Sequence, residues 1–242
     1  MISLSKIAAV EERCGKLFQV GANGKLTRFN EQGAAALFAS AKEVIFATEE
    51  SRYYIYAPHI GLWEPKSREE MLSALDFFLH EWAEELSVDG LEDKRRQPVL
   101  SSMLNFLPAL CGRHCFFRHP DKVFIHVGNG VLELDDSGAW RLNPFSPDYH
   151  SRNRCEIPYC PGAQCPRFLS ELLAPLLMDD DKDLVQQMIG MCLTGKNITQ
   201  SILLLTGSGG SGKGTLANIT EGLVGDANVT HSVWSTPNRP SS

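Results

Sequence analysis

A glycine-rich segment constrains this chain more than any other feature of its sequence. Residues 206–215 read Thr-Gly-Ser-Gly-Gly-Ser-Gly-Lys-Gly-Thr, and they follow the apolar run Ile202–Leu205. Gly207, four further residues, and then Gly212 and Lys213 match the first part of the phosphate-binding-loop pattern. A short apolar run bounded by polar and glycine residues is typical of a strand buried on both faces of a parallel sheet. The sequence therefore predicts a buried strand that leads into a loop.

A helix is expected directly after this loop. Leu216, Ile219 and Leu223 are spaced by three and four residues, and Gly225 marks the end of the pattern. A flexible Gly/Ser linker is the alternative interpretation of the glycine-rich segment. Such a linker would not lie between a buried strand and an amphipathic helix, so the strand, loop and helix are the favoured interpretation.

The residue types in the loop suit the binding of a nucleotide phosphate. Glycines let consecutive backbone N–H groups turn inward around phosphate oxygens without Cβ clashes, and the following helix presents its positive dipole end to the same anion. Lys213 would reach the β- and γ-phosphates and is the candidate catalytic residue. The predicted ATP-binding residues are Gly207, Ser208, Gly209, Gly210, Ser211, Gly212, Lys213, Gly214 and Thr215.

The metal ligand of the usual pattern is displaced in this sequence. A Ser or Thr normally follows the lysine directly, and its hydroxyl binds Mg²⁺. Here Gly214 occupies that position, and the next hydroxyl is on Thr215, which is the candidate Mg²⁺ ligand. Some nucleoside monophosphate kinases also read Gly-Lys-Gly-Thr and hold the metal largely through water. The pattern therefore supports ATP binding better than tight metal-assisted hydrolysis.

Nucleotide hydrolysis requires parts that we do not find after the loop. A second strand ending in Asp or Glu organises Mg²⁺ and water, and an arginine is usually supplied by a neighbour. No apolar strand capped by acids follows Lys213, and Leu176–Asp180, which superficially resembles one, precedes the loop in a helical region. We therefore expect this chain to be the N-terminal part of an ATPase.

Composition limits the class of protein. The chain has 242 residues, a length that predicts one large domain or two small ones. Its net charge is −6, from 23 Lys and Arg against 29 Asp and Glu. Its acidic balance argues against coating nucleic acid with the whole surface, but not against a small basic patch. We find no apolar run near the roughly 18 residues of a membrane span and no secretory signal at Met1–Lys6, and the seven cysteines predict reduced thiols. A cytoplasmic protein without membrane contact is expected.

The pattern along the chain predicts a mixed α/β fold. Ala34–Ala41 favours a helix, and Val44–Thr48 and Tyr53–Tyr56 favour paired strands. Ser67 and Glu70 form a capping-box pattern at the start of a long helix. Its apolar stripe is expected to face the core rather than a partner, and consists of Met71, Leu72, Leu75, Phe78, Leu79, Trp82 and Leu86.

Further elements are expected in the second half of the chain. A second helix is predicted over about Val99–Leu107, and a β-hairpin over Lys122–Leu134. Residues 143–167 hold five of the thirteen prolines and predict an extended connector. The pattern is helical from Phe168 to about Leu193.

The connector and the loop together resemble a known family. Ser146–Tyr149 and Ile157–Leu169 resemble the phage and plasmid primase–helicases, superfamily 3 helicases related to the poxvirus primase–helicase. Their typical pattern is Tyr-Asp-Pro-x-Ala-x-Cys-Pro and an aromatic, followed by a helical collar, for which Leu184–Gly195 is the counterpart, and by the ATP loop. Cys160 replaces the usual Asp of this pattern, and Gly214 replaces the usual Ser after the lysine.

The resemblance implies an architecture and an activity. Residues 1–142 would form a small α+β domain, 143–197 the connector and collar, and 198–242 the first strand, P-loop and helix of an incomplete AAA+-like ATPase domain. The family implies a hexameric, ATP-driven helicase that unwinds single-stranded or forked DNA for the replication of a mobile element. Its pore loops, acidic hydrolysis motif and arginine finger would lie beyond residue 242, and a primase catalytic domain is not expected upstream.

Two other functions remain open at this point. A truncated, non-catalytic module could retain oligomerisation or DNA contacts without the hydrolysis motifs. A small-molecule kinase shares the Gly-Lys-Gly-Thr loop, but such kinases place that loop near the N-terminus.

Three further groups of residues suggest other sites. Cys155, Cys160 and Cys165 invite a zinc interpretation, as do Cys111, His114, Cys115 and His119, but neither spacing is typical of zinc ligands. A basic group with nearby aromatics could follow a single strand of nucleic acid, although an ordinary solvated face is favoured. Its members are Arg113, Arg118, Lys122, Arg152, Arg154 and Arg167, with Phe116, Phe117 and Tyr149.

Overall fold

The computed structural model describes residues 3–118, 123–195, 199–225 and 228–232. The chain divides into two compact units. The N-terminal unit comprises Met1–Pro120 and Ser146–Arg152, and the C-terminal unit comprises Asp121–Phe145 and Asn153–Ser242. The fold is mixed α/β as predicted, with helices and three small sheets among the described residues. The division between the units does not coincide with the boundaries predicted after residues 142 and 197.

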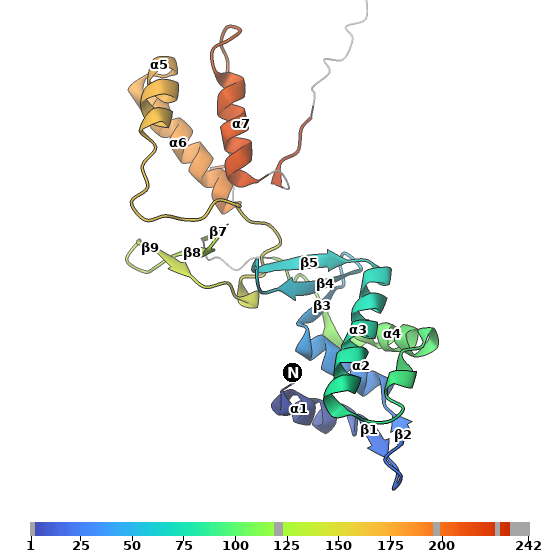
Figure 1. Cartoon of the computed structure of the whole chain (residues 1–242). Helices are drawn as coiled ribbons and strands as arrows, with labels where there is room; N and C mark the ends of the chain where they lie inside the picture. The colour runs from blue at the N-terminus through green and yellow to red at the C-terminus, as the bar shows by residue number, and fades with distance from the viewer. Residues whose placement is uncertain (1–2, 119–122, 196–198, 226–227, 233–242) are drawn as a thin grey trace, which may run out of the picture. The chain divides into compact units, whose positions relative to one another are not determined.

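The N-terminal unit consists of a small mixed sheet, a separate hairpin and a group of helices (Figure 1). Its four-stranded sheet has the order β5-β4-β3-β6, in which β3 and β6 are parallel and the other neighbours antiparallel. The elements are α1 (Leu4–Cys14), β1 (Phe18–Val20), β2 (Leu26–Phe29), α2 (Glu31–Ala41), β3 (Val44–Ala47), β4 (Arg52–Ala57), β5 (Leu62–Lys66), α3 (Arg68–Leu86), η1 (Glu92–Lys94), α4 (Gln97–Cys111) and β6 (Gly112–Arg113).

The two faces of this sheet have different partners. Along β3, Val44 and Phe46 pack with the helices, whereas Ile45 and Ala47 belong to a second apolar cluster on the other face. This alternation follows the two-residue period of a strand. The paired strands predicted around residues 44–48 and 53–56 are confirmed as an antiparallel pair in which Ile45 opposes Tyr54.

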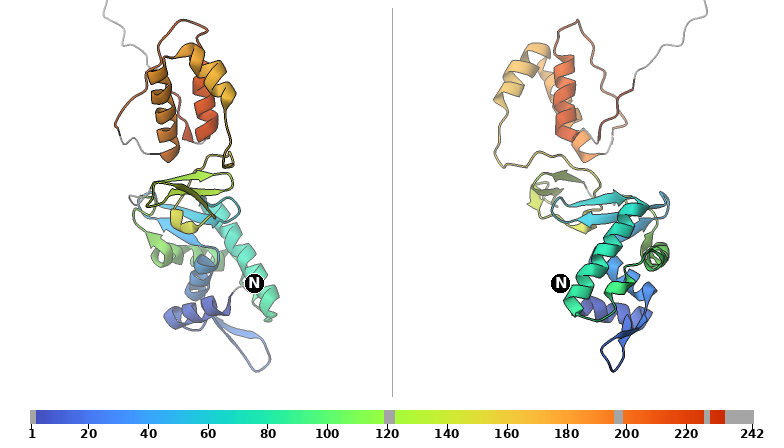
Figure 2. Two further views of the ribbon diagram at one scale, coloured as in Figure 1. Left: turned by 90° about the vertical axis from the view of Figure 1, so that its left-hand side faces the viewer. Right: turned by 45° about the vertical axis from the view of Figure 1, so that its right-hand side comes forward.

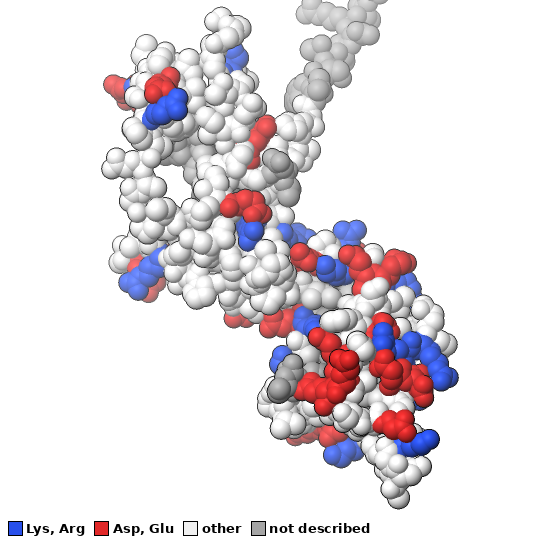
Figure 3. All heavy atoms as spheres, in the orientation of Figure 1, with Lys and Arg blue, Asp and Glu red and all other residues white. Residues whose placement is uncertain are grey.

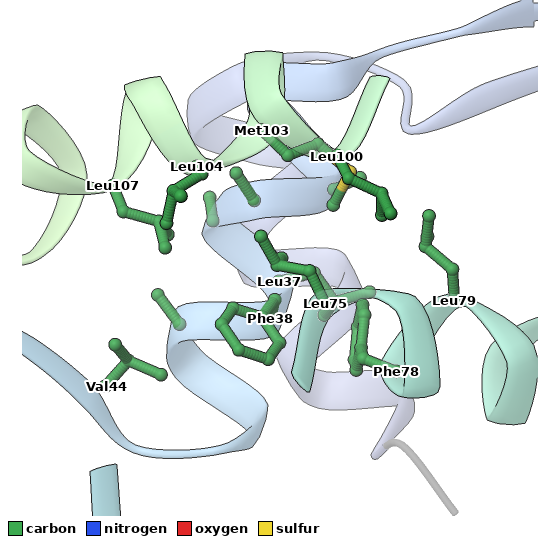
Figure 4. Close-up of a cluster of buried hydrophobic side chains, with 14 of the residues drawn as sticks. Leu37, Phe38, Val44, Leu75, Phe78, Leu79, Leu100, Met103, Leu104 and Leu107 are labelled. Carbon is green, nitrogen blue, oxygen red and sulfur yellow. The ribbon is translucent and has the colours of Figure 1, made fainter. Parts of the chain in front are cut away.

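The main core lies among α2, α3 and α4, which pack together on one side of the sheet (Figure 2). Figure 4 shows side chains from these three helices and Val44 pointing toward one another. The predicted core-facing stripe of α3 is confirmed, since its buried residues are Met71, Leu75, Phe78, Leu79 and Trp82. Phe38 and Phe78 meet edge to face, with ring centroids 5.4 Å apart.

The start of α3 has the predicted capping box. The Glu70 backbone N–H donates to Ser67 Oγ at 3.1 Å, and the Ser67 backbone N–H donates to a Glu70 carboxylate oxygen at 2.7 Å. Each side chain thus satisfies a backbone donor that the first turn leaves without a helical partner. The helix predicted over Val99–Leu107 is also present, and α4 extends it to Gln97–Cys111.

One part of the predicted connector belongs to the N-terminal unit. The short η2 helix (Pro147–Tyr149) and the residues after it lie against β5, one of the two edge strands of the sheet. The Trp63 backbone N–H donates to the Ser151 carbonyl at 2.8 Å, and Trp63 Nε1 donates to the Pro147 carbonyl at 3.0 Å. These bonds place Ser146–Arg152 in a unit that is otherwise formed by the first 120 residues.

The C-terminal unit begins with the predicted hairpin, which continues as a three-stranded meander. It is formed by β7 (Phe124–Val127), β8 (Gly130–Leu134) and β9 (Trp140–Asn143). The connector then runs along β7, because the Cys155 N–H donates to the His126 carbonyl at 2.9 Å and the Gly128 N–H donates to the Ile157 carbonyl at 3.0 Å. Between the end of β9 at Asn143 and residue 165, the connector has no helix or strand apart from η2, so the predicted extended connector over residues 143–167 is present over most of its length.

The helical region after the connector is broken into two parts. The π-helix η3 (Phe168–Leu173) continues into α5 (Ala174–Leu176), and α6 (Asp179–Thr194) starts after an extended Leu177 and Met178. The predicted range of Phe168–Leu193 is thus helical, but not as one element. Three aspartates, which favour the positive end of a helix, open α6 and explain why a new helix starts there. No described helix is both long and apolar enough to cross a membrane.

The prediction of a strand at Ile202–Leu205 is wrong, because no strand forms there in this structure. The segment has no strand assignment, and Ile202 and Leu204 are 92% and 81% exposed. An apolar run becomes a buried strand only where neighbouring strands satisfy its backbone groups. No described strand pairs with this segment, and only Leu205 packs against an apolar cluster.

Candidate phosphate-binding site

The glycine-rich segment forms a tight loop that leads directly into a helix. The helix α7 (Lys213–Val224) begins at Lys213, as the loop pattern predicts, and it ends before Gly225. Gly207 and Gly212 have φ values of 153° and 77°. Side chains rarely tolerate this region of φ, so glycine at these two positions allows the loop to turn.

The side chain of Lys213 lies inside the loop. Its ammonium group donates to the carbonyl oxygens of Gly207 at 3.0 Å and Ser208 at 2.9 Å, and to Ser211 Oγ at 2.9 Å. A positive charge is therefore held beside the N-terminal end of α7, which is itself the positive end of the helix dipole. Both features favour an anion at this place.

The backbone of α7 adds hydrogen-bond donors to this charge. The first intrahelical bond of the turn is donated by the Leu216 N–H to the Gly212 carbonyl, at 3.0 Å. The N–H groups of Lys213, Gly214 and Thr215 precede it and have no partner within the helix. Such groups at a helix start bind phosphate oxygens in many proteins.

A small apolar cluster holds the loop and α7 in place. Its buried members are Leu173, Val185, Ile189 and Leu216, contributed by η3, α6 and α7. Leu205, just before the loop, packs against the same cluster. A Cβ added at Gly212 would lie 2.7 Å from Leu176 Cδ1, so the loop also makes a close contact with α5. Sequence patterns gave no signal for this contact.

The candidate Mg²⁺ ligand is less well placed than the candidate phosphate-binding residues. Thr215 is exposed on the first turn of α7, and no hydrogen bond or ion pair that we describe connects it with an acidic side chain. Within the described ranges, no group of three or more His, Cys, Asp and Glu side chains is arranged to hold a metal ion. The residues present fit a nucleotide phosphate better than they fit a directly bound metal.

Comparison with protein-family models and with curated proteins found no match. The assignment of this site therefore depends on the geometry of the loop, and the family resemblance stays a prediction.

The first cysteine group is dispersed. Cys155 is buried with Val127 and Leu132 in an apolar cluster, whereas Cys160 and Cys165 are exposed. A buried thiol in apolar surroundings behaves as a small hydrophobic residue.

The second cysteine group contains another core thiol. Cys111 Sγ donates to the Leu107 carbonyl at 3.1 Å, and burial raises the pKa of this thiol to about 11. His114 instead lies at the surface, where its Nδ1 is 3.3 Å from Thr48 Oγ1. His119 lies outside the described residues.

Several of the basic residues considered for nucleic-acid binding are engaged in ion pairs. Arg152 contacts Glu50 at 2.7 Å, and its guanidinium lies 4.5 Å from the ring centre of Phe117. The other described pairs are Arg154 with Glu156 at 2.6 Å and Arg167 with Glu171 at 3.0 Å. Arg113 and Arg118 are exposed, and Lys122 lies outside the described residues. On the face drawn in Figure 3, basic and acidic side chains are interspersed over the N-terminal unit.

Two of the aromatic residues near this group pack against other rings within the N-terminal unit. Phe117 is buried against Tyr54, and Phe116 lies edge to face with Trp63 and stacks on His150. Rings packed in this way do not offer free faces on which bases could stack. The pairing and packing favour the solvated-face interpretation over a nucleic-acid track.

Proposed function

We propose that this chain binds ATP through Gly207–Thr215 and that it is the N-terminal part of a superfamily 3 DNA helicase of a mobile element. One observation carries the ATP part: the Lys213 ammonium is held inside the glycine loop at the start of α7. The resemblance of residues 146–169 to the primase–helicase connector supports the helicase part. The proposal also places the chain in the cytoplasm, where ATP is available and the free thiols of this chain remain reduced.

Each part of the site has a role in holding the triphosphate. The free N–H groups at the start of α7 would donate to phosphate oxygens, and the Lys213 charge would offset the charge on the β- and γ-phosphates. Gly214 leaves no hydroxyl directly after the lysine, so Thr215 would hold Mg²⁺ mainly through water. The metal, when bound, would neutralise charge on the phosphates.

Nucleotide binding tests this proposal directly. A fluorescent ATP analogue should bind the wild-type chain, and Lys213→Ala should weaken binding about tenfold to 100-fold because it removes a charged hydrogen-bond donor. Lys182→Ala is the matched control, since the Lys182 ammonium pairs with Asp179 at 2.7 Å in the same unit. Equal affinities of the two variants, or no binding by the wild type, would refute the ATP part.

Assembly and DNA binding test the helicase part. The family resemblance predicts that the full-length protein forms hexamers and binds forked or single-stranded DNA. Sedimentation with and without ATP measures the first, and fluorescence anisotropy with a labelled fork measures the second. Because the pore loops would lie beyond residue 242, both measurements use the chain extended through its downstream sequence. An extended chain that binds ATP but stays monomeric and binds no fork would support the nucleotide site and contradict a ring helicase.

A nucleotide-binding module without turnover is the second candidate. It is favoured by Gly214, which replaces the hydroxyl residue that normally holds the metal for hydrolysis. Steady release of inorganic phosphate from ATP by this chain would exclude it. Transfer of phosphate to a nucleoside monophosphate would instead indicate the small-molecule kinase, which shares the Gly-Lys-Gly-Thr sequence.

A further inference from the structure

The Lys213 ammonium has a complete set of partners before any nucleotide arrives. An ammonium group has three N–H donors and no acceptor. The three acceptors around it are the carbonyl oxygens of Gly207 and Ser208 and the hydroxyl oxygen of Ser211, at 3.0, 2.9 and 2.9 Å. A phosphate oxygen can therefore bind this ammonium only by replacing one of them.

The three acceptors differ in how readily they can be replaced. The two carbonyls belong to the loop backbone, so moving either of them requires a change in the loop itself. Ser211 Oγ can leave by rotation of a single side-chain torsion. The hydroxyl also has a proton to donate, which a carbonyl lacks, so it can donate to the incoming phosphate oxygen.

We propose that Ser211 is a positioning residue, whose hydroxyl holds the Lys213 ammonium in the loop and exchanges it for a phosphate oxygen when nucleotide binds. The holding step stands on the geometry of the loop alone, and the exchange step rests on the proposed ATP binding. Ser211 thereby does two things: it keeps the charge in place before binding, and it donates a hydrogen bond afterwards.

The space at Gly207 supports a close pairing of Ser211 with Lys213. A Cβ added at Gly207 would lie 3.1 Å from Ser211 Oγ and 3.7 Å from Lys213 Nζ. The first distance is tighter than most contacts of a Cβ and the second is an ordinary contact, so a side chain at position 207 would press on Ser211. The first glycine of the loop thus leaves room for the pair, in addition to allowing its positive φ.

Lysine acylation without nucleotide tests the holding step. Ser211→Ala should raise the rate at which N-hydroxysuccinimidyl acetate modifies Lys213 about threefold to tenfold, because the amine loses one acceptor in a partly exposed site. Lys182, whose partner is Asp179, is the internal reference, and mass spectrometry gives both rates. Ser211→Thr should restore the slow rate. Ser170→Ala, which removes a hydroxyl bonded to the Pro166 carbonyl, should leave both rates unchanged.

Binding of the fluorescent ATP analogue tests the exchange step. Ser211→Ala should weaken binding about threefold to tenfold, with recovery in Ser211→Thr. An unchanged Lys213 acylation rate in Ser211→Ala overturns the inference, whatever the nucleotide affinity. A raised rate in a chain that binds no ATP supports the holding step and refutes ATP binding. A raised rate with unchanged ATP affinity overturns the exchange step.

Discussion

Replacing Leu216 with alanine should loosen the C-terminal unit at the point where it supports the loop. Leu216 is 6% exposed and lies one turn after Lys213, in a cluster with Leu173, Val185 and Ile189. Burial of this side chain fixes the start of α7 against η3 and α6. The variant therefore removes packing beneath the loop without touching any residue that would contact phosphate.

The magnitude follows from the size of the cluster. A buried Leu→Ala substitution costs about 2–5 kcal/mol, depending on how far the site relaxes. This cluster has four buried members and several half-buried neighbours, so relaxation is easy and we expect about 2–3 kcal/mol. That loss corresponds to a shift of roughly 30-fold to 150-fold in the local opening equilibrium.

Amide hydrogen exchange read by mass spectrometry measures this shift within each unit. Peptides from α6 and α7 should exchange faster in Leu216→Ala, whereas peptides from α3 in the N-terminal unit should not change. Ile219→Ala is the matched control because Ile219 is in the same helix and 41% exposed, so it should cost less than about 1 kcal/mol. Equal effects of the two variants, or faster exchange in α3, would refute the assignment of Leu216 as the anchor.

Three other variants or modifications have expected outcomes. The Cys111 thiol, whose burial raises its pKa to about 11, should resist iodoacetamide at pH 8 while the exposed Cys160 reacts; similar rates by mass spectrometry would contradict this. Asp76→Asn breaks a two-bond pair with Arg95 at 2.8 and 2.7 Å and should cost about 0.5–1 kcal/mol at pH 7. That pair lowers the pKa of Asp76 in the folded state. In urea titrations, the difference in unfolding free energy between Asp76→Asn and wild type should therefore shrink as the pH falls below about 3.9 and through the lower folded-state pKa. Ser67→Ala removes the cap of α3 and should lower the unfolding free energy by about 1 kcal/mol, with Ser67→Thr retaining most of it.

The predictions that hold rest on local patterns. The capping box at Ser67 and Glu70, the stripe of α3 and the hairpin around Gly130 each depend on residues close together in the sequence. The first three elements of the chain gave weaker signals. In α1 only Val10 is buried, and β1 and β2 have no fully buried residue, so their apolar patterns are short and incomplete.

Long-range pairings were not accessible from the sequence. The prolines of residues 143–167 correctly predict an extended connector, but they do not indicate which part pairs with which unit. Trp63 bonds to Ser151 and Pro147, whereas Gly128 bonds to Ile157, and these bonds connect the two halves of the connector to different units. The choice depends on hydrogen bonds with residues more than 20 positions away in the sequence and leaves no periodic signal.

The loop and the strand predicted before it illustrate why one part of the site was predictable and the other was not. All the bonds of Lys213 that we describe are made within Gly207–Lys213, and the left-handed backbone of Gly212 is a property of that residue. The loop can therefore take its shape from local chemistry, with Leu216 as its support. A strand at Ile202–Leu205 needs hydrogen-bond partners from other segments. The apolar pattern indicates only that pairing with such segments would be favourable. It follows that the shape of the loop and the formation of a sheet are separable here, and that the proposed nucleotide binding would not require the strand.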